Sequence, residues 1–161
     1  MKLIATALTL TVPLCLAACG ETSAADLTSA GRLALNSGQP EKALRKFEQA
    51  LERLQAVDEG YLEAKMGAIQ ARIKVDAEAA KDEFLNLAET DPDLVGPRDY
   101  SFIGGHMADA KAWTQAVDVV HAGIQRYGEG ESKLKALLEN IKLEAKSNPA
   151  LASKLEGLGY L

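Results

Sequence analysis

Three segments of the chain repeat one pattern of small and large apolar residues at nearly constant spacing. Ala43, Ala80 and Ala116 are separated by 37 and 36 residues. The positions four after, seven after and twelve before these alanines also agree in size, and they hold Phe47, Phe84 and Val120, then Ala50, Leu87 and Gly123, and finally Gly31, Ala68 and Gly104. A pattern that recurs at this interval predicts a stack of similar units, each burying its apolar face against the next.

Helical periodicity dominates the chain from Asp26 onward. Apolar residues recur at helical spacing, period-two runs of β-branched residues are absent, and Gly or Pro residues separate the apolar stretches. We therefore predict an all-α chain of short paired helices near residues 26–37, 40–56, 60–74, 77–89, 98–110, 112–127, 131–146 and 149–157.

The first copy of the repeat, AGRLALNSGQPEKALRKFEQAL at residues 30–51, resembles a tetratricopeptide repeat (TPR), the helix–turn–helix unit of about 34 residues. The second copy, at 61–93, keeps Ala80, Phe84 and Pro92, and the third, at 100–124, keeps Tyr100, Gly104, Trp113, Ala116 and Gly123. The resemblance implies a short TPR-like α-solenoid of about three repeats over residues 26–130, closed by C-terminal capping helices in 131–161. It also implies that Phe47, Phe84, Tyr100 and Trp113 pack in the core.

The first 18 residues have the layout of a secretory signal peptide: Lys2, an uncharged run from Leu3 to Leu16, and two alanines. This run is shorter than the roughly 20 residues that a spanning helix needs, and Pro13 interrupts it. We expect residues 1–18 to be cleaved.

The residues Leu16-Ala17-Ala18-Cys19 resemble the lipobox of bacterial lipoproteins. The resemblance implies cleavage before Cys19, acylation of Cys19, and residues 19–25 as a short tether. Gly20, in place of the aspartate that retains such proteins in the inner membrane, favours the outer membrane facing the periplasm. A plain secreted protein, or a cytosolic one with an apolar first helix, is the alternative.

Charge and cysteine content narrow the function classes. Without Lys2, the mature chain has 17 cationic and 23 anionic side chains, which argues against a nucleic-acid partner. Cys15 leaves with the signal peptide and Cys19 is acylated, so neither a disulfide nor a thiolate metal site is expected.

No motif in the sequence points to catalysis. His106 and His121 lack a phosphate-loop or metal-ligand pattern around them. The acidic pairs Asp91/Asp93 and Glu129/Glu131 lack the spacing of a calcium loop. We expect no enzyme activity, no cofactor and no metal.

The family's concave face, lined by the first helix of each pair, is the expected partner-binding surface. The resemblance places on it Thr28, Arg32, Leu35, Asn36, Lys65, Ile69, Arg72, Ile73, Arg98, Ser101, Gly105, Ala108 and Asp109. From this set we take Arg32, Asn36, Lys65, Arg72, Arg98, Ser101 and Asp109 as candidate binding residues. Four cations against one acid suggest a groove for an acidic peptide or helix, although chance yields such a count as readily.

These features together predict a membrane-anchored periplasmic adaptor or scaffold that binds another protein. By analogy of fold, it would assist the assembly of envelope machinery such as pili or secretins. One alternative is an accessory factor that recruits cell-wall enzymes. Another is an enzyme or small-ligand carrier that uses the inside of the solenoid.

Overall fold

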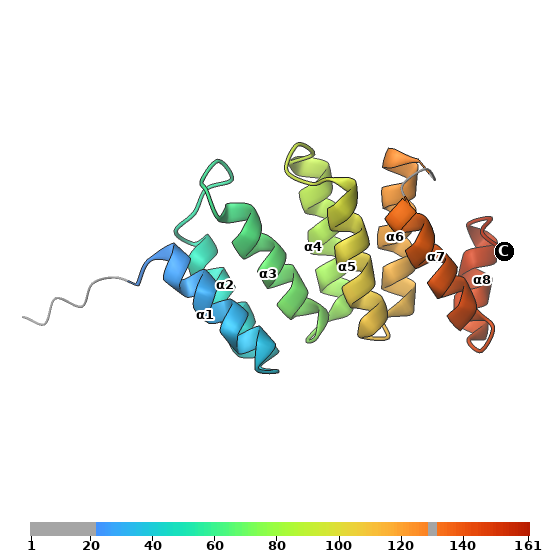
Figure 1. The fold of residues 1–161 in the computed structure, drawn as a ribbon, viewed down its shortest axis with the longest axis horizontal. Coiled ribbons are helices and arrows are strands. Elements are labelled where there is room, and N and C mark those ends of the chain that lie inside the picture. The colour runs from blue at the N-terminus through green and yellow to red at the C-terminus, as the bar shows by residue number, and fades with distance from the viewer. Residues whose placement is uncertain (1–21, 129–131) are drawn as a thin grey trace, which may run out of the picture.

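The computed structural model describes residues 22–128 and 132–161. The signal peptide, Cys19 and the Glu129/Glu131 pair lie outside these ranges. Every regular element in the described part is a helix, as the sequence predicts. The helices are α1 (Ala24–Asn36), α2 (Pro40–Leu51), α3 (Tyr61–Ile73), α4 (Ala77–Thr90), α5 (Pro97–Asp109), α6 (Trp113–Tyr127), α7 (Ser132–Ala145) and α8 (Pro149–Gly157) (Figure 1).

The helix ends form where the sequence supplies caps. The side chains of Ser23, Asp76 and Asn148 accept hydrogen bonds from backbone N–H groups in the first turns of α1, α4 and α8. Pro40 begins α2, where its missing N–H group costs nothing. Gly38, with φ of 70°, provides the left-handed turn that ends α1 and leads into α2.

Two predicted boundaries are corrected. The helix expected over 40–56 ends at Leu51, because i→i+3 bonds from Arg53 and Leu54 tighten its last turn. Asp58 then accepts the N–H of Gln55 at 2.7 Å, which favours a turn over continued helix. At the other end, helix α1 begins at Ala24, so the last two residues of the expected tether are helical.

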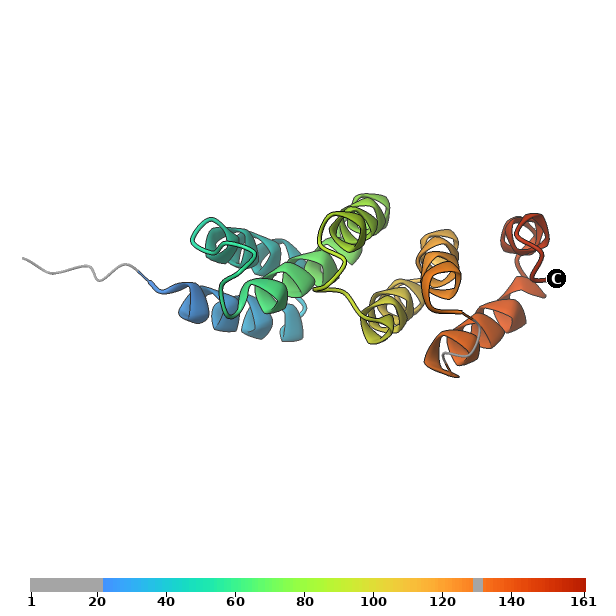
Figure 2. The ribbon, with the colours of Figure 1, turned by 90° about the horizontal axis from the view of Figure 1, so that it is seen from above.

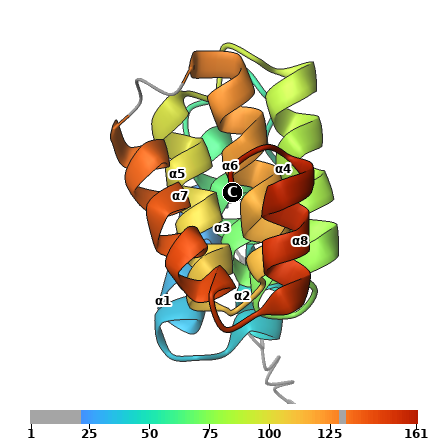
Figure 3. The same ribbon diagram turned by 90° about the vertical axis from the view of Figure 1, so that its right-hand side faces the viewer.

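The helices form two layers, one of α1, α3, α5 and α7 and the other of α2, α4, α6 and α8 (Figure 2). From α1 to α4 and from α5 to α8, each helix packs against the next one along the chain. Within the layers, α1 contacts α3, α3 contacts α5, α5 contacts α7, α4 contacts α6, and α6 contacts α8. The view along the stack shows α7 and α8 in front, on opposite sides (Figure 3). The last two helices thus continue the two-layer arrangement.

The apolar core is divided unevenly along the stack. One large cluster reaches from α3 to α8 and contains Phe84 and Tyr100, whose rings meet edge to face at 5.0 Å. At the N-terminal end a smaller cluster holds Phe47 among four alanines, Ala34, Ala43, Ala68 and Ala71. Phe47, Phe84 and Tyr100 are buried as predicted, whereas Trp113 is only half-buried. Phe47 is therefore the one large residue among the buried members of this smaller cluster.

Within the described residues, no helix combines the length and apolar character needed to cross a bilayer.

Candidate functional site

Two of the expected groove cations instead tie the layers together. Lys65 Nζ lies 2.7 Å from Glu83 Oε1, and Arg72 Nε lies 2.7 Å from Glu83 Oε2. Arg72 Nη2 also lies 2.8 Å from Glu48 Oε1. Glu48 is on α2 and Glu83 on α4, so these side chains of α3 reach toward the other layer. This corrects the expected placement of Lys65 and Arg72 on an open, cationic groove.

Neutralising Glu83 should therefore destabilise the protein. We expect Glu83→Gln to lower the free energy of unfolding by about 1–2 kcal/mol, since it leaves two partly buried cations with weaker partners. Glu139→Gln, which breaks an exposed pair with Lys142, should change it by less than about 0.5 kcal/mol. Urea unfolding of both variants measures the difference, and equal effects would contradict the assigned role of Glu83.

The remaining candidates are scattered over the layer of first helices. Arg32 pairs with Glu63 of α3 at 2.5 Å, an acid that the sequence reasoning left out of this face. Arg98 is exposed, and its carbonyl accepts a bond from Ser101 Oγ. Asp109 is exposed at the end of α5, and Asn36 lines a cavity described below. The structure does not bring the seven predicted residues together.

Four other residues predicted for this face are buried instead. Thr28, Ile69, Ile73 and Ala108 are all at most 9% exposed. Thr28 Oγ1 donates to the carbonyl of Ala24 within its own helix. These side chains pack α1, α3 and α5 rather than meet a partner.

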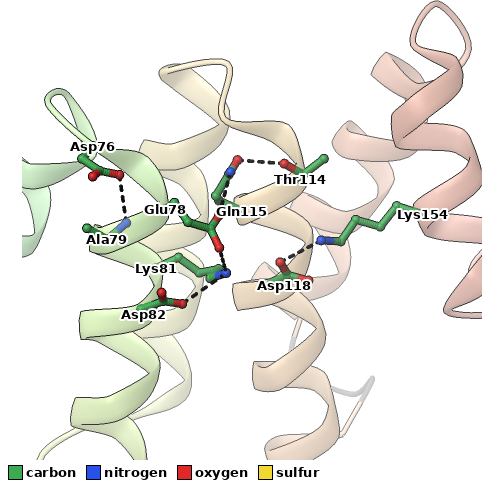
Figure 4. A network of polar contacts seen from close by, with 9 residues as sticks. All are labelled: Asp76, Glu78, Ala79, Lys81, Asp82, Thr114, Gln115, Asp118 and Lys154. Carbon is green, nitrogen blue, oxygen red and sulfur yellow. Dashed lines mark hydrogen bonds and ion pairs between the residues drawn. The ribbon is translucent and has the colours of Figure 1, made fainter.

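Polar side chains of the second layer bond to one another from helix to helix (Figure 4). Gln115 of α6 donates to Glu78 of α4 at 3.0 Å, and Glu78 also pairs with Lys81. Both hydrogen bonds keep the pKa of Glu78 below its usual value, and the bond from Lys81 has the larger effect. Further along, Lys154 of α8 pairs with Asp118 of α6 at 2.7 Å. This network joins α4, α6 and α8.

A cleft crosses the layer of first helices over α1, α3 and α5. It consists of two cavities, of about 200 and 420 Å³, that share Gln70. We call them the Gly67 cavity and the His106 cavity, and together the first-helix cleft. The Gly67 cavity is lined by Arg32, Phe47, Glu63, Met66, Gly67, Gln70 and Phe102, and the His106 cavity by Leu35, Asn36, Gly38, Pro40, Gln70, Lys74 and His106.

Two glycines bring the helices close to the ring of Phe47 at the floor of the cleft. A Cβ atom on Gly67 would lie 2.5 Å from two carbons of this ring, and one on Gly31 would lie 2.8 Å from it. Phe47 itself is fully buried. The absence of side chains at both positions thus allows α1 and α3 to close over the ring.

A polar pair divides the cleft and bridges α3 and α5. Gln70 Nε2 lies 2.8 Å from His106 Nε2, and in this arrangement the amide donates to an unprotonated imidazole nitrogen. The ring of Phe102 meets the imidazole edge to face at 4.4 Å. Phe102 is nevertheless 46% exposed, so it offers an apolar surface beside the polar pair.

The environment of His106 favours its neutral form. Partial burial, and more weakly the charge of Lys74, lower the pKa of His106, while Asp109 acts in the opposite direction. The unfolded chain then binds a proton near pH 6.5 that the folded chain takes up only at lower pH. The neutral form of His106 therefore favours the folded state fully above the pKa that this residue has in the unfolded chain. This advantage is lost as the pH falls through the lower pKa of the folded chain.

We therefore expect acidification to destabilise the native protein more than a variant without this imidazole. Between pH 7.5 and 5.5 the free energy of unfolding should fall further in the native protein than in His106→Gln. Urea titrations at the two pH values measure both slopes. A smaller fall in the native protein than in the variant would contradict the lowered pKa.

Among the described residues, the cleft holds no cluster of side chains that could bind a metal ion. In the described ranges 22–128 and 132–161, no group of three or more His, Cys, Asp or Glu side chains is placed to hold a metal ion. His106 faces an amide, a phenyl ring and a lysine rather than a gathering of carboxylates.

Sequence reasoning missed the central residues of the cleft, Met66, Gln70, Lys74 and Phe102. A helical wheel of α3 places Met66, Gln70 and Lys74 with Glu63 on one side, away from the buried alanines, and this signal was available. Phe102 is not among the residues predicted above for the binding face. Its exposure depends on how α5 is rotated against α3, which no local pattern specifies.

Comparison of the chain with protein-family models, with curated proteins and with solved structures finds no match.

Proposed function

We propose that this protein is a lipid-anchored adaptor of a bacterial envelope that binds a segment of another protein in the first-helix cleft. Its fold in this proposal is a TPR-like α-solenoid, and its place is the outer membrane, facing the periplasm. The partner belongs to envelope machinery such as a pilus or secretin system. The observation that carries the proposal is the cleft itself, an open surface with exposed Phe102 at its centre.

Chemistry of the cleft supports binding of an extended or helical segment. Apolar surface from Met66 and Phe102 lies beside the polar groups of Gln70, Asn36 and Lys74. Binding sites combine apolar walls with a few polar groups in this way, commonly in cavities of about 300–1,000 Å³. Both cavities are open to solvent, so a segment can enter from the surface.

Equivalent contacts in successive helix pairs support the solenoid. Ala43, Ala80 and Ala116 are each fully buried at the aligned positions. Small residues of the pattern meet large ones, since a Cβ on Gly31 would touch Phe47 and one on Gly104 would touch Val120. Because α7 and α8 continue both layers, we include them as a fourth pair instead of a separate cap.

In this proposal, the lipid anchor determines how far the first-helix cleft lies from the membrane. Only three residues separate Cys19 from the cap residue Ser23, and this length spans at most about 14 Å. Acylation of Cys19 would hold α1 close to the bilayer surface. A partner bound in the cleft would then be concentrated at the membrane, which is the physical benefit of a tethered adaptor.

Phe102→Ser tests the binding surface, with Leu33→Ser as its control. Both residues are exposed apolar side chains of first helices, but Leu33 does not line the cleft. After crosslinking in cells and purification of full-length protein, we expect Phe102→Ser to reduce recovery of the specific partner at least about tenfold, as for a central aromatic contact. Leu33→Ser should leave recovery unchanged. Equal recovery with both variants would contradict the proposal.

A further inference from the structure

The His106 cavity carries one charge that no acid neutralises. Among the described residues that line it, Lys74 is the only one with a formal charge when His106 is neutral. No carboxylate in the described ranges lies within 4.0 Å of its ammonium group, although lysine and arginine side chains form eight ion pairs within this distance elsewhere in those ranges. Asp109 acts on His106 but is not part of the lining. This cavity therefore complements an anion.

Charge in the Gly67 cavity is balanced, by contrast. Arg32 and Glu63 pair with each other at its rim. The rest of the lining is mainly apolar, from Phe47, Met66 and Phe102, together with the partly buried Gly67 and the side chain of Gln70. Such a surface complements an apolar side chain, and an unpaired charge would be unfavourable there.

The turn next to the His106 cavity has no backbone donors to offer. The N–H of Gly38 donates to the carbonyl of Leu35 at 3.0 Å, and that of Gln39 donates to the carbonyl of Ala34 at 2.9 Å. Sites that capture a chain's terminal carboxylate use free backbone N–H groups arranged as a nest. With these donors occupied, Lys74 provides a single flexible point charge, which suits an acidic side chain.

We propose that the first-helix cleft selects a segment in which a bulky apolar side chain fills the Gly67 cavity and a nearby acidic side chain pairs with Lys74. Gln70, which lines both cavities, lies between the two contacts and offers its amide to the backbone of the segment. This inference rests on the proposed function, because it specifies the partner's chemistry at the same surface. It replaces the cationic groove expected from Arg32, Lys65 and Arg72 with one cation and one apolar cavity.

The test is selection from a library of random ten-residue peptides displayed between two carrier domains, so that no peptide has a free terminal carboxylate. Full-length protein in detergent micelles serves as bait, beside Lys74→Glu and Phe102→Ser. Circular dichroism confirms that each bait is folded. Lys146→Glu is the matched control, an exposed lysine directly after α7 and outside the cleft.

We expect the native protein and Lys146→Glu to enrich peptides that hold Asp or Glu within a few residues of an aromatic or branched apolar residue. Lys74→Glu should weaken the binding of those peptides at least about tenfold, because it places a glutamate next to their acidic side chains. Phe102→Ser should also fail to enrich these peptides.

Two results would overturn the inference in different ways. Peptides that depend on Phe102 but lack acidic residues, or that bind Lys74→Glu equally well, would contradict the inference and leave the proposed function standing. Failure of every bait to enrich a peptide whose binding depends on Phe102 would contradict both.

Discussion

Gly67→Ala is expected to lower the free energy of unfolding by about 1–3 kcal/mol. The new methyl group would lie 2.5 Å from the ring of Phe47, and that ring cannot withdraw because Gly31 closes on it as well. The other buried residues of this cluster are alanines, and the leucines that pack against it, Leu35, Leu44 and Leu51, are only partly buried. The improvement in helix propensity, about 1 kcal/mol, does not offset this overlap.

Gly105→Ala is the matched control. It also places alanine inside a helix of the first layer, but a Cβ atom at this position would have nothing within 4 Å of it. We expect this variant to be more stable than the native protein by about 0.5–1 kcal/mol. Opposite signs in urea unfolding would support the tight packing of α1, α3 and Phe47.

A double-mutant cycle isolates the contact itself. Phe47→Leu reduces the volume beneath Gly67, so it should cost less in the Gly67→Ala background than in the native protein. A coupling energy near zero would contradict direct overlap between the added methyl group and the ring. If Gly105→Ala also destabilised the protein, the loss of stability in Gly67→Ala could not be assigned to overlap with the ring of Phe47.

Cys19→Ser is expected to abolish acyl labelling and release the protein from the membrane fraction. A single chain gives only marginal membrane binding, and stable anchoring takes two signals, so loss of the acylated residue should be nearly all-or-none. The measurement is labelling with a radioactive fatty acid in the native host, followed by fractionation.

Cys15→Ser is the control for this experiment. It also removes a thiol near the end of the apolar run, but Cys15 leaves with the signal peptide if cleavage occurs before Cys19. We expect labelling and membrane association to persist. Retained labelling in Cys19→Ser, or equal loss in Cys15→Ser, would contradict the anchor.

The sequence predicted the helices well because their ends carry local signals. Pro40, Asp76, Pro97 and Asn148 act through their own backbone or the adjacent turn, so their effects can be read without knowing the fold. The end of α2 was missed because the apolar spacing continues to residue 56 while Asp58 favours a turn. A periodic pattern and a competing side-chain bond give opposite signals there.

The cleft was harder to predict because it depends on how helices are rotated and on which ions pair. Lys65 and Arg72 read as free cations until α4 brings Glu83 within 2.7 Å of both. The contact between Gln70 and His106 joins residues 36 positions apart and depends on the packing of α3 beside α5. Periodicity shows that a helix has an outer face, but it does not show which acids from other helices reach it.

Site-specific photocrosslinking in the native host tests the binding surface most directly. A photoreactive amino acid would replace Met66, Gln70 or Phe102 in the cleft, or the exposed residues Arg45, Asn86 and Gln125 of the second helices. We predict that the three cleft positions capture one common partner, and that the three positions in the other layer do not. Capture of that partner from the second helices alone would contradict binding in the first-helix cleft.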